Sequence, residues 1–462
     1  MTADFQKYQD HFNEKALEVK AGPVEKRTCT DIVCLIFFIL VFIGTLILGG
    51  VFLHKGKGEI WKLVAETGDN ATSLGKVMVK HVGPIIGMLI LSNVLSVVFI
   101  LLAKNFPRCL FYTMMVITFF IYLAIIIIGF VVKSYGLAFI FIVIFAINAL
   151  ILWCYWDYIK IGLKLIECAA RFLTEKPAIY FISLISLALN LIFTIFWIFA
   201  WVGASALSLD SDTYSSLSIL WYAIGVFFTF LLYYFMVFAV ASAVAFWYYQ
   251  NENTNVIQGF LNLKYHLGSV AFGSLVITII TVMRVLAETQ KANNNSCLGC
   301  IACCMALLLS CIEELVKVLN HNAIICMSVT GEGYVDSAKS AIGLIFDNFG
   351  VFIIIDFFVD FMEVYSVIFA VLIPALIGGG IIYASDGTDF ASTYAIWGAI
   401  IIFFLALLLS EVILGMLEEV LSSIFIFYCF DQKFRKMGIP VHNIPREIKQ
   451  IMDEASGNSQ AH

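Results

Sequence analysis

Long apolar runs alternate with short polar stretches along almost the whole of this 462-residue chain. Several runs reach the length of about 20 apolar residues that a helix needs to cross a bilayer core about 30 Å thick. Because the runs are continuously apolar, the alternating pattern of a membrane β-barrel is excluded. The pattern predicts an all-α polytopic membrane protein with about ten transmembrane helices. We expect spans at residues 32 to 53, 85 to 103, 109 to 132, 137 to 154, 178 to 204, 219 to 249, 270 to 287, 297 to 316, 350 to 383 and 394 to 430.

The composition agrees with that pattern. Hydrophobic residues make up 61% of the chain and charged residues 13%, whereas a soluble domain carries roughly a quarter charged residues. An aqueous fold of this size is therefore excluded. The net charge of -6 is confined to loops and tails, and the absence of a basic face argues against nucleic-acid binding.

Basic residues predict the orientation and the domain organisation. The expected inside segments hold 19 Lys and Arg and the outside segments 7, so both termini are predicted to be cytosolic. Five of those seven lie in the first outside loop, residues 54 to 84. We expect a cytosolic segment at 1 to 31, a transmembrane domain at 32 to 430 and a cytosolic tail at 431 to 462.

Two shorter features refine this topology. Between residues 155 and 175, apolar positions from Ile159 to Leu173 share one helical face, which predicts an amphipathic helix lying flat at the cytosolic surface. Asn70 begins an Asn-Ala-Thr glycosylation sequon in the first outside loop. That sequon predicts a glycoprotein if the chain passes through the secretory pathway.

The twelve cysteines and the other reactive residues favour no catalytic or metal chemistry. Cys297, Cys300, Cys303 and Cys304 are closely spaced, but no second pair or His follows at ligand spacing. We expect buried or lipid-modified thiols there, with a metal site as the alternative. The chain has no phosphate-binding Gly-Lys-Ser loop, His-Glu-x-x-His or Gly-x-Ser-x-Gly motif, so we predict no enzyme activity and no cofactor.

Several segments, in order along most of the chain, resemble the choline transporter-like family of solute carriers. The segment from Arg27 to Asp31 resembles the family's basic Cys-Thr-Asp entry to the first helix, and the segment from Phe425 to Lys433 resembles its exit. The most specific resemblance is at Tyr265 to Ser274. The motif residues are Tyr265, His266, Gly268, Gly273, Asn320, Asn322 and Lys339, and Asp360 and Glu418 fall where the family has intramembrane acids.

The chain also departs from the family pattern. Phe272 and Val367 stand where the family often has Lys, and Ser422 stands where its last helix often has Asp. The first outside loop is short, whereas family members typically carry a long Cys-rich glycosylated domain there.

Acidic residues inside the spans are candidate ligands for a cation. Asp356, Asp360 and Glu363 are spaced i, i+4 and i+7 on one helical face, and Glu411 and Glu418 are seven residues apart. A carboxylate within the bilayer costs roughly 2.5 to 3.5 kcal/mol, so a bound cation would explain it. Pairing with a basic side chain, packing or an interfacial position is the alternative.

Aromatic side chains provide the faces that bind a quaternary ammonium group. Trp197 and Trp201 are one helical turn apart, and Trp221 and Tyr233 lie on the next expected span. These four, with Asp360 and Glu418, form the predicted substrate-binding set. An interfacial aromatic belt is the alternative interpretation.

Gly378 to Gly380, together with Pro374, predict a weakened end of the ninth span. Broken helices are common at transport sites. Close helix packing at the glycines is the alternative.

The resemblance implies a transporter that moves choline, or a related organic cation such as ethanolamine, by alternating access. It implies the plasma membrane, with an organellar membrane, including the mitochondrial one, as the alternative. A non-transporting scaffold or accessory subunit that keeps the carrier fold is the second hypothesis, and a pore is the third. The expected partners are the organic cation and the lipid bilayer, and the sequence specifies no protein partner.

Overall fold

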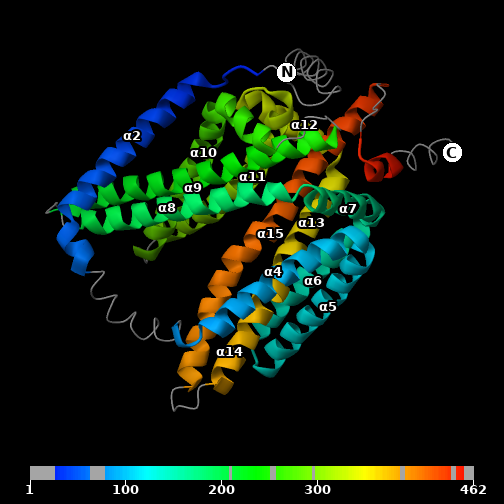
Figure 1. Ribbon diagram of the computed structural model, residues 1–462, viewed down its shortest axis with the longest axis horizontal. Coiled ribbons are helices and arrows are strands. Elements are labelled where there is room, and N and C mark those ends of the chain that lie inside the picture. Colours follow the sequence, from blue (N-terminus) through cyan, green and yellow to red (C-terminus); the bar gives the residue numbers. More distant parts are fainter. Residues whose placement is uncertain are drawn as a thin grey trace. The chain divides into compact units, whose positions relative to one another are not determined.

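The computed structural model describes residues 27–62, 79–205, 207, 211–249, 256–293, 297–385, 391–438 and 444–451. Within these ranges every regular element is a helix, which confirms the all-α prediction. Nine helical stretches in the described ranges are long and apolar enough to cross a membrane. The chain is therefore a polytopic membrane protein, divided into two compact units whose elements are labelled in Figure 1.

Unit 1 comprises residues Met1–Gly75, Ala178–Leu344 and Phe430–Val441. Helices α9, α10 and α11 pack against one another, and α2 packs on α8 and α10. The helices of this unit are α2 (Ile32–Lys55), α8 (Tyr180–Ala204), α9 (Ser211–Tyr248), α10 (Val256–Asn293), α11 (Cys297–Thr330) and most of α12 (Tyr334–Asp347).

Glycines allow the ends of α2 and α8 to meet. A Cβ atom on Gly56 would overlap the backbone of Gly203, and one on Gly203 would overlap the carbonyl of Phe52. Small residues of this kind let two membrane helices approach backbone to backbone. Beside this crossing, Phe52, Ala200, Ala204 and Trp221 form a buried apolar cluster.

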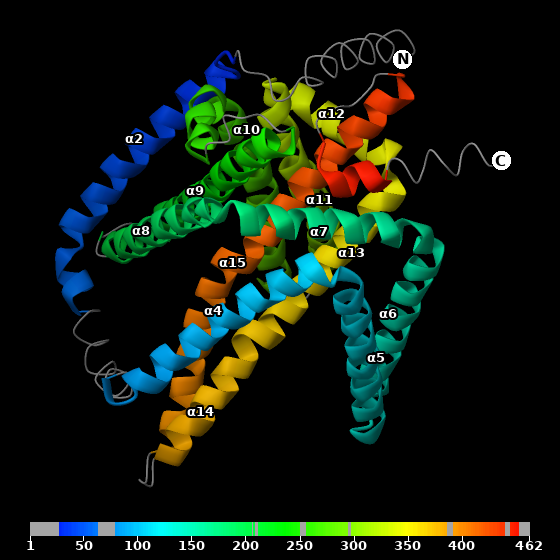
Figure 2. The same ribbon diagram turned by 45° about the vertical axis from the view of Figure 1, so that its right-hand side comes forward.

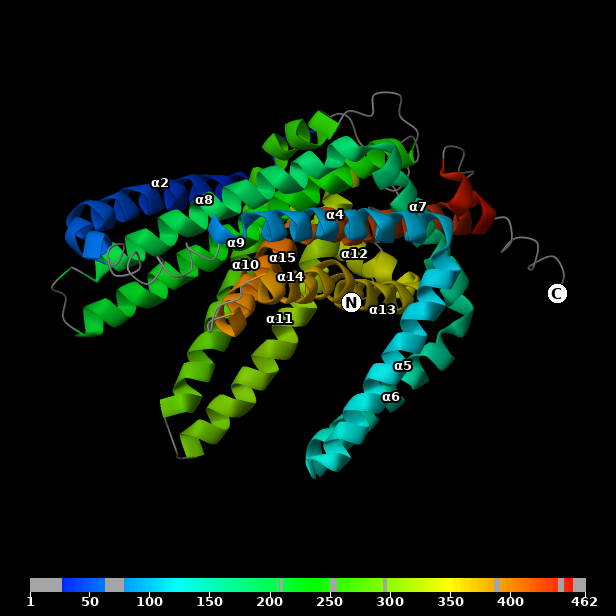
Figure 3. The same cartoon turned by 60° about the horizontal axis from the view of Figure 1, so that its bottom comes forward.

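Unit 2 comprises residues Lys76–Pro177, Ile345–Cys429 and His442–His462. Pro107 begins α5, where its missing N–H leaves no hydrogen bond unmade, and α5 and α6 form the hairpin seen in Figure 3. The elements of this unit are α4 (Val82–Asn105), α5 (Pro107–Val131), α6 (Tyr135–Cys154), η1 (Trp156–Tyr158), α7 (Ile159–Glu175), α13 (Phe349–Ser366), η3 (Val367–Leu372), α14 (Ile373–Ser385) and α15 (Ala391–Lys436) as far as Cys429.

Helix α7 is the amphipathic helix that the sequence predicts. It begins at Ile159, after the short turn η1, and ends at Glu175. The apolar side chains of its predicted face, from Ile159 to Leu173, are buried. They are covered by protein, since α7 packs on α4, α5 and α13 (Figure 2). Its position at the cytosolic surface stays a prediction.

The ninth predicted span is one helical run whose hydrogen-bond pattern changes before Pro374. Residues Val367–Leu372 form a π-helical segment, and α14 then continues through the glycines. Because Pro374 has no N–H, the preceding turn cannot close in the usual α-helical pattern. The glycines serve close packing: a Cβ on Gly378 would overlap Ile402, and one on Gly379 would lie 2.9 Å from Ala399 Cβ.

The eighth predicted span, residues 297 to 316, forms the first half of α11. It is not among the nine candidate spans of the described residues, so a tenth span stays a prediction. The Asn70 sequon lies outside the described residues, and so do the side chains of Cys297 and Cys300. In the part of the chain that the structure describes, no three His, Cys, Asp or Glu side chains are grouped to hold a metal ion.

Candidate functional site

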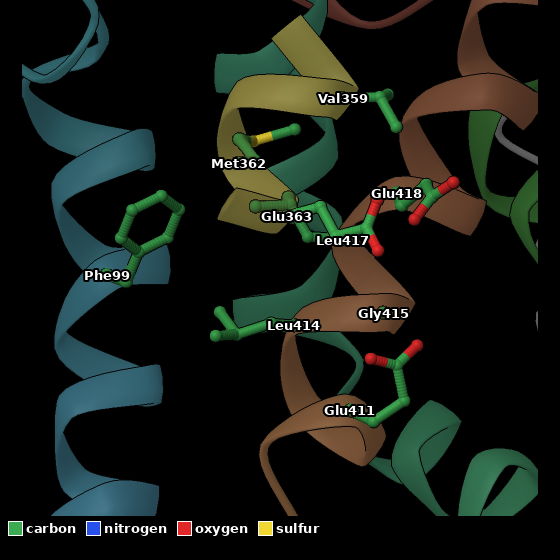
Figure 4. Close-up of a pocket in the computed structure, with 9 residues that line it drawn as sticks. All are labelled: Phe99, Val359, Met362, Glu363, Glu411, Leu414, Gly415, Leu417 and Glu418. Atoms are coloured by element: carbon green, nitrogen blue, oxygen red, sulfur yellow. The ribbon is translucent and has the colours of Figure 1, made fainter. Parts of the chain in front are cut away.

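An acidic cavity in unit 2 is the best candidate for a binding site. It has a volume of about 170 Å³ and is lined by residues of α4, α13 and α15. Figure 4 shows the carboxylate of Glu363 reaching from α13 toward α15. The described lining residues are Phe99, Val359, Met362, Glu363, Glu411, Leu414, Gly415, Leu417 and Glu418.

Three of the lining residues are glutamates, and none of the described lining residues is Lys or Arg. Glu411 and Glu418 are seven residues apart on α15, so two helical turns place them on the same face. Glu363 joins them from α13. Like charges held this close destabilise one another unless a cation or a proton neutralises them, so the arrangement is suited to binding a small cation.

Gly415 leaves room for one of these carboxylates. A Cβ atom at this position would lie 2.5 Å from Glu411 Oε1, so the carboxylate of Glu411 rests against the bare backbone of α15. Any larger residue would push this carboxylate aside. Gly415 is therefore a positioning residue for the cavity.

Of the two acidic residues in the predicted substrate-binding set, Glu418 lines the cavity and Asp360 does not. Asp356 and Asp360 are exposed on α13, about two turns and one turn before Glu363, respectively. The sequence also named Glu363 and Glu411 as candidate cation ligands, and both line the cavity. It did not show which of the facing carboxylates border a cavity.

The predicted aromatic residues lie in unit 1 and form a structural contact between α8 and α9. Trp197 Nε1 donates to the Trp221 carbonyl at 2.9 Å, and Trp221 Nε1 donates to the Trp197 carbonyl at 3.1 Å. Trp221 is fully buried beside Phe52, and Trp201 packs against the same cluster. This reciprocal pair satisfies both indole N–H groups within the protein.

Trp197 also borders an apolar groove of about 300 Å³ in unit 1, together with Tyr222 and residues of α8, α9 and α10. Its indole lies against Gly225, where a Cβ would be 2.6 Å from the ring. Tyr233 does not line this groove; its hydroxyl lies 3.2 Å from His321 Nδ1. The structure thus brings Trp197, Trp201 and Trp221 together and places Tyr233 elsewhere on α9.

Two of the family-like segments meet in unit 1 through a chain of hydrogen bonds, which we call the clasp (Arg27, Thr30, Asp31, His266 and Ser269). Arg27 Nη1 can only donate, so His266 Nε2 accepts at 3.3 Å and His266 Nδ1 donates to Thr30 Oγ1 at 3.0 Å. Thr30 then donates to Ser269 Oγ at 2.6 Å, and Ser269 donates to Asp31 Oδ2 at 2.5 Å. Because Arg27 can only donate and the Asp31 carboxylate accepts, every hydrogen bond of the clasp donates in the direction from Arg27 toward Asp31.

Backbone contacts tighten the clasp. Arg27 Nη2 donates to the Ser328 carbonyl at 2.5 Å, and burial lowers the pKa of Arg27 to about 10. Asp31 Oδ2 also accepts the N–H of Tyr334 at 2.9 Å, at the start of α12. Asp31 has a left-handed backbone, with φ 51°, and a Cβ on Gly268 would overlap its carbonyl.

The remaining motif residues are structural in unit 1. Asn320 Nδ2 donates to the Gly273 carbonyl at 2.9 Å, and a side chain on Gly273 would overlap Asn320. Asn322 bonds to the carbonyl one turn before it, and Lys339 pairs with Asp336 at 3.1 Å.

The structure places two of the residues that differ from the family pattern. Phe272, where the family often has Lys, packs edge to face on Tyr334 with ring centroids 5.1 Å apart. Val367 is the first residue of the π-helical segment. Nothing in the structure explains Ser422.

The sequence pattern of the family described as plasma-membrane choline transporter matches residues 139–433. Choline transporter-like protein 2 of Salmo salar is 35% identical over 105 residues, 22% of this chain and 15% of the relative. Choline transporter-like protein 4 of Xenopus laevis is 36% identical over 104 residues, with the same shares.

A longer match is to choline transporter-like protein 1 of Torpedo marmorata, which is 28% identical over 230 residues, 47% of this chain and 34% of the relative. The aligned segments thus span between 15% and 34% of the length of these relatives. The family match includes α13 and most of α15, and with them every carboxylate of the acidic cavity.

Proposed function

Because this chain belongs to the plasma-membrane choline transporter family, we propose that it carries choline, or a related small organic cation such as ethanolamine, across the membrane. It is a multi-pass membrane protein, and the family match supports the plasma membrane as its location. Its named relatives are transporters, in agreement with the prediction that it is not an enzyme.

The observation that carries the proposal is the acidic cavity between α4, α13 and α15. Glu363, Glu411 and Glu418 border one small volume, with no Lys or Arg among its described lining residues. A bound organic cation would neutralise part of this charge, and the membrane potential would favour its inward movement by about 2.3 kcal/mol per 100 mV. We propose these three glutamates as the substrate-binding carboxylates.

The lining also bears on which cation is favoured. A quaternary ammonium has no N–H donor and depends on aromatic faces, whereas the cavity has one described aromatic residue, Phe99. A primary ammonium donates hydrogen bonds to carboxylates directly. Choline and ethanolamine therefore both belong in the test, and the ratio of their uptake rates measures how far Phe99 acts as a cation–π surface.

Alternating access is part of the proposal. Asp360 in unit 2 and the aromatic set of α8 and α9 in unit 1 stay candidate substrate contacts, each within its own unit. Trp197 borders the groove of unit 1, which makes it the most accessible of the aromatic candidates for a substrate. Trp221 is fully buried and would act through the position of Trp197.

The test is uptake of labelled choline and ethanolamine by liposomes containing the purified protein. We expect uptake by the wild type and a loss of at least tenfold in Glu418→Gln and Glu363→Gln. Glu314→Gln is the matched control, because Glu314 is 70% exposed in an ion pair with Lys317. Full uptake by both cavity variants would overturn the site, and no uptake of either cation by folded wild type would favour the scaffold hypothesis.

A further inference from the structure

The C-terminal segment that the structure describes, residues 444–451, is anchored to unit 2. Residues 444–451 belong to that unit and include a short helix from 446 to 451. Ile444, Ile448 and Ile451 are buried, with Ile448 fully so. The sequence predicts this segment only as part of a cytosolic tail. The segment buries an apolar face and is therefore docked on the protein.

A buried ion pair joins the C-terminal segment to α7. Arg171 Nη1 of α7 lies 2.9 Å from Glu447 Oε1, and the side chain of Glu447 is only 2% exposed. The other oxygen of this carboxylate, Oε2, has no hydrogen-bond partner among the described residues. Arg446 Nε also lies 3.0 Å from Glu447 Oε1, but the Arg446 side chain is 75% exposed. Arg171 is the buried partner, and removing it leaves the buried carboxylate with an exposed cation in its place.

Helix α7 connects this ion pair to the acidic cavity. Gly162, on α7, packs against α13 so closely that a Cβ would lie 2.9 Å from both Ile354 and Phe358. The next turn of α13 carries Val359, Met362 and Glu363, which line the cavity. Through these contacts a change in the position of α7 is passed directly to one wall of the cavity.

From these contacts we infer that the C-terminal segment, residues 444–451, is a regulatory strap: docked on α7 through Glu447, it holds α7 against α13 and so sets the affinity of the acidic cavity for its cation. The inference rests on the proposed function only for the identity of the ligand. Releasing the strap frees α7, loosens the wall that carries Glu363 and weakens cation binding. Any event that neutralises Glu447 or covers the segment would have this effect.

Cys168 reports on the strap independently of transport. It lies one turn before Arg171 on α7 and is fully buried. Burial raises the pKa of the Cys168 thiol well above its usual value, the Glu447 carboxylate raises it further, and the Arg171 guanidinium lowers it. Faster labelling in Arg171→Gln would therefore come from release of the strap and not from the lost charge. Since the thiolate is the reactive form, alkylation of Cys168 is slow while the strap is docked.

The first experiment measures maleimide labelling of Cys168 in the full-length protein, read by peptide mass spectrometry. We expect at least tenfold faster labelling in Glu447→Gln and in Arg171→Gln. The double variant Arg171→Glu with Glu447→Arg restores an ion pair and should restore protection. Glu175→Gln is the matched control, because Glu175 lies 3.6 Å from the same guanidinium but is 46% exposed.

The second experiment measures the cavity itself. A cysteine introduced by Met362→Cys should react with a positively charged methanethiosulfonate reagent about fivefold faster or slower when Glu447→Gln is added. In the uptake assay, Glu447→Gln should raise KM about fivefold while the maximal rate changes less than twofold.

Equal protection of Cys168 in the wild type and Glu447→Gln would overturn the strap. Exposure of Cys168 with an unchanged rate at Met362→Cys would overturn its connection to the cavity. If the wild type carries no organic cation, the proposed function fails, and the two thiol rates still decide the strap.

Discussion

The clasp of unit 1 and the acidic cavity of unit 2 place their acidic residues in opposite surroundings. Asp31 accepts hydrogen bonds from Ser269 and from the backbone of Tyr334 through a single oxygen, and a chain of donors leads from it back to Arg27. Glu411 and Glu418 border a cavity with no described basic residue in its lining. A carboxylate whose charge is met by protein donors serves stability, and one left facing a cavity is available to a ligand.

The largest effect should come from breaking the clasp at Asp31. Asp31→Ala leaves the hydroxyl of Ser269 and the N–H of Tyr334 without their acceptor, and Ala tolerates the left-handed backbone less well than Asp. We expect unfolding to become easier by about 3 kcal/mol, measured by denaturant titration in detergent micelles. Asp336→Ala, which removes only an exposed ion pair with Lys339, should cost less than about 1 kcal/mol; equal losses in the two variants would show that the clasp has no special role.

Gly415→Ala tests the other side of the comparison, because it displaces the Glu411 carboxylate while adding only one methyl group. KM for the transported cation should rise about tenfold, equivalent to about 1.4 kcal/mol of binding, and the melting temperature should hardly change. Gly380→Ala is the control, since a Cβ there meets nothing within 4 Å. A KM shift of the same size in the control would indicate a general effect of alanine in these helices.

Trp197→Phe asks whether the aromatic pair of unit 1 belongs with the clasp as a structural contact. It removes the indole N–H that donates to Trp221 at 2.9 Å and keeps an aromatic ring over Gly225. The expected loss is about 1 kcal/mol of stability with uptake intact. Trp153→Phe, at a 78% exposed position, is the comparison; uptake that collapses in Trp197→Phe alone would place the indole on the substrate path.

The smallest effect is expected for Asp360→Asn. Asp360 is exposed on α13 and does not line the cavity, so the substitution should change choline uptake less than threefold. A larger loss than in Glu418→Gln would move the binding site along α13 to the position that the family resemblance favours.

The long apolar helices were predictable from the sequence, because hydropathy over about 20 residues and a 3.6-residue period are local properties. Helix α12 was not predicted. The apolar face of α7 from Ile159 to Leu173 follows directly from that period, and the structure buries it. The π-helical segment that begins at Val367 was not predicted, although Pro374 indicated a weakened helix nearby.

The sites were harder to predict, because they depend on contacts between distant parts of the chain. Arg27 and His266 were both in recognised segments, yet 239 positions separate them and no local pattern pairs them. In the same way, the helical period placed Glu363 beside Asp360 on α13 but could not show that the cavity between α4, α13 and α15 includes Glu363 and not Asp360. Trp221 was predicted to contact the substrate, but the structure buries it fully. An aromatic residue within a span fits either role, so the sequence could not distinguish them.

The π-helical segment changes how substitutions beyond it should be interpreted. One turn there contains an extra residue, which rotates everything after Leu372 by about 100° relative to an uninterrupted α-helix. A helical wheel drawn straight through from Phe349 would therefore turn Gly378 and Gly379 away from their neighbours Ile402 and Ala399. Cysteine-scanning or tryptophan-scanning data from this stretch need two wheels, with the second starting at Ile373, before any position is assigned to lipid or to protein.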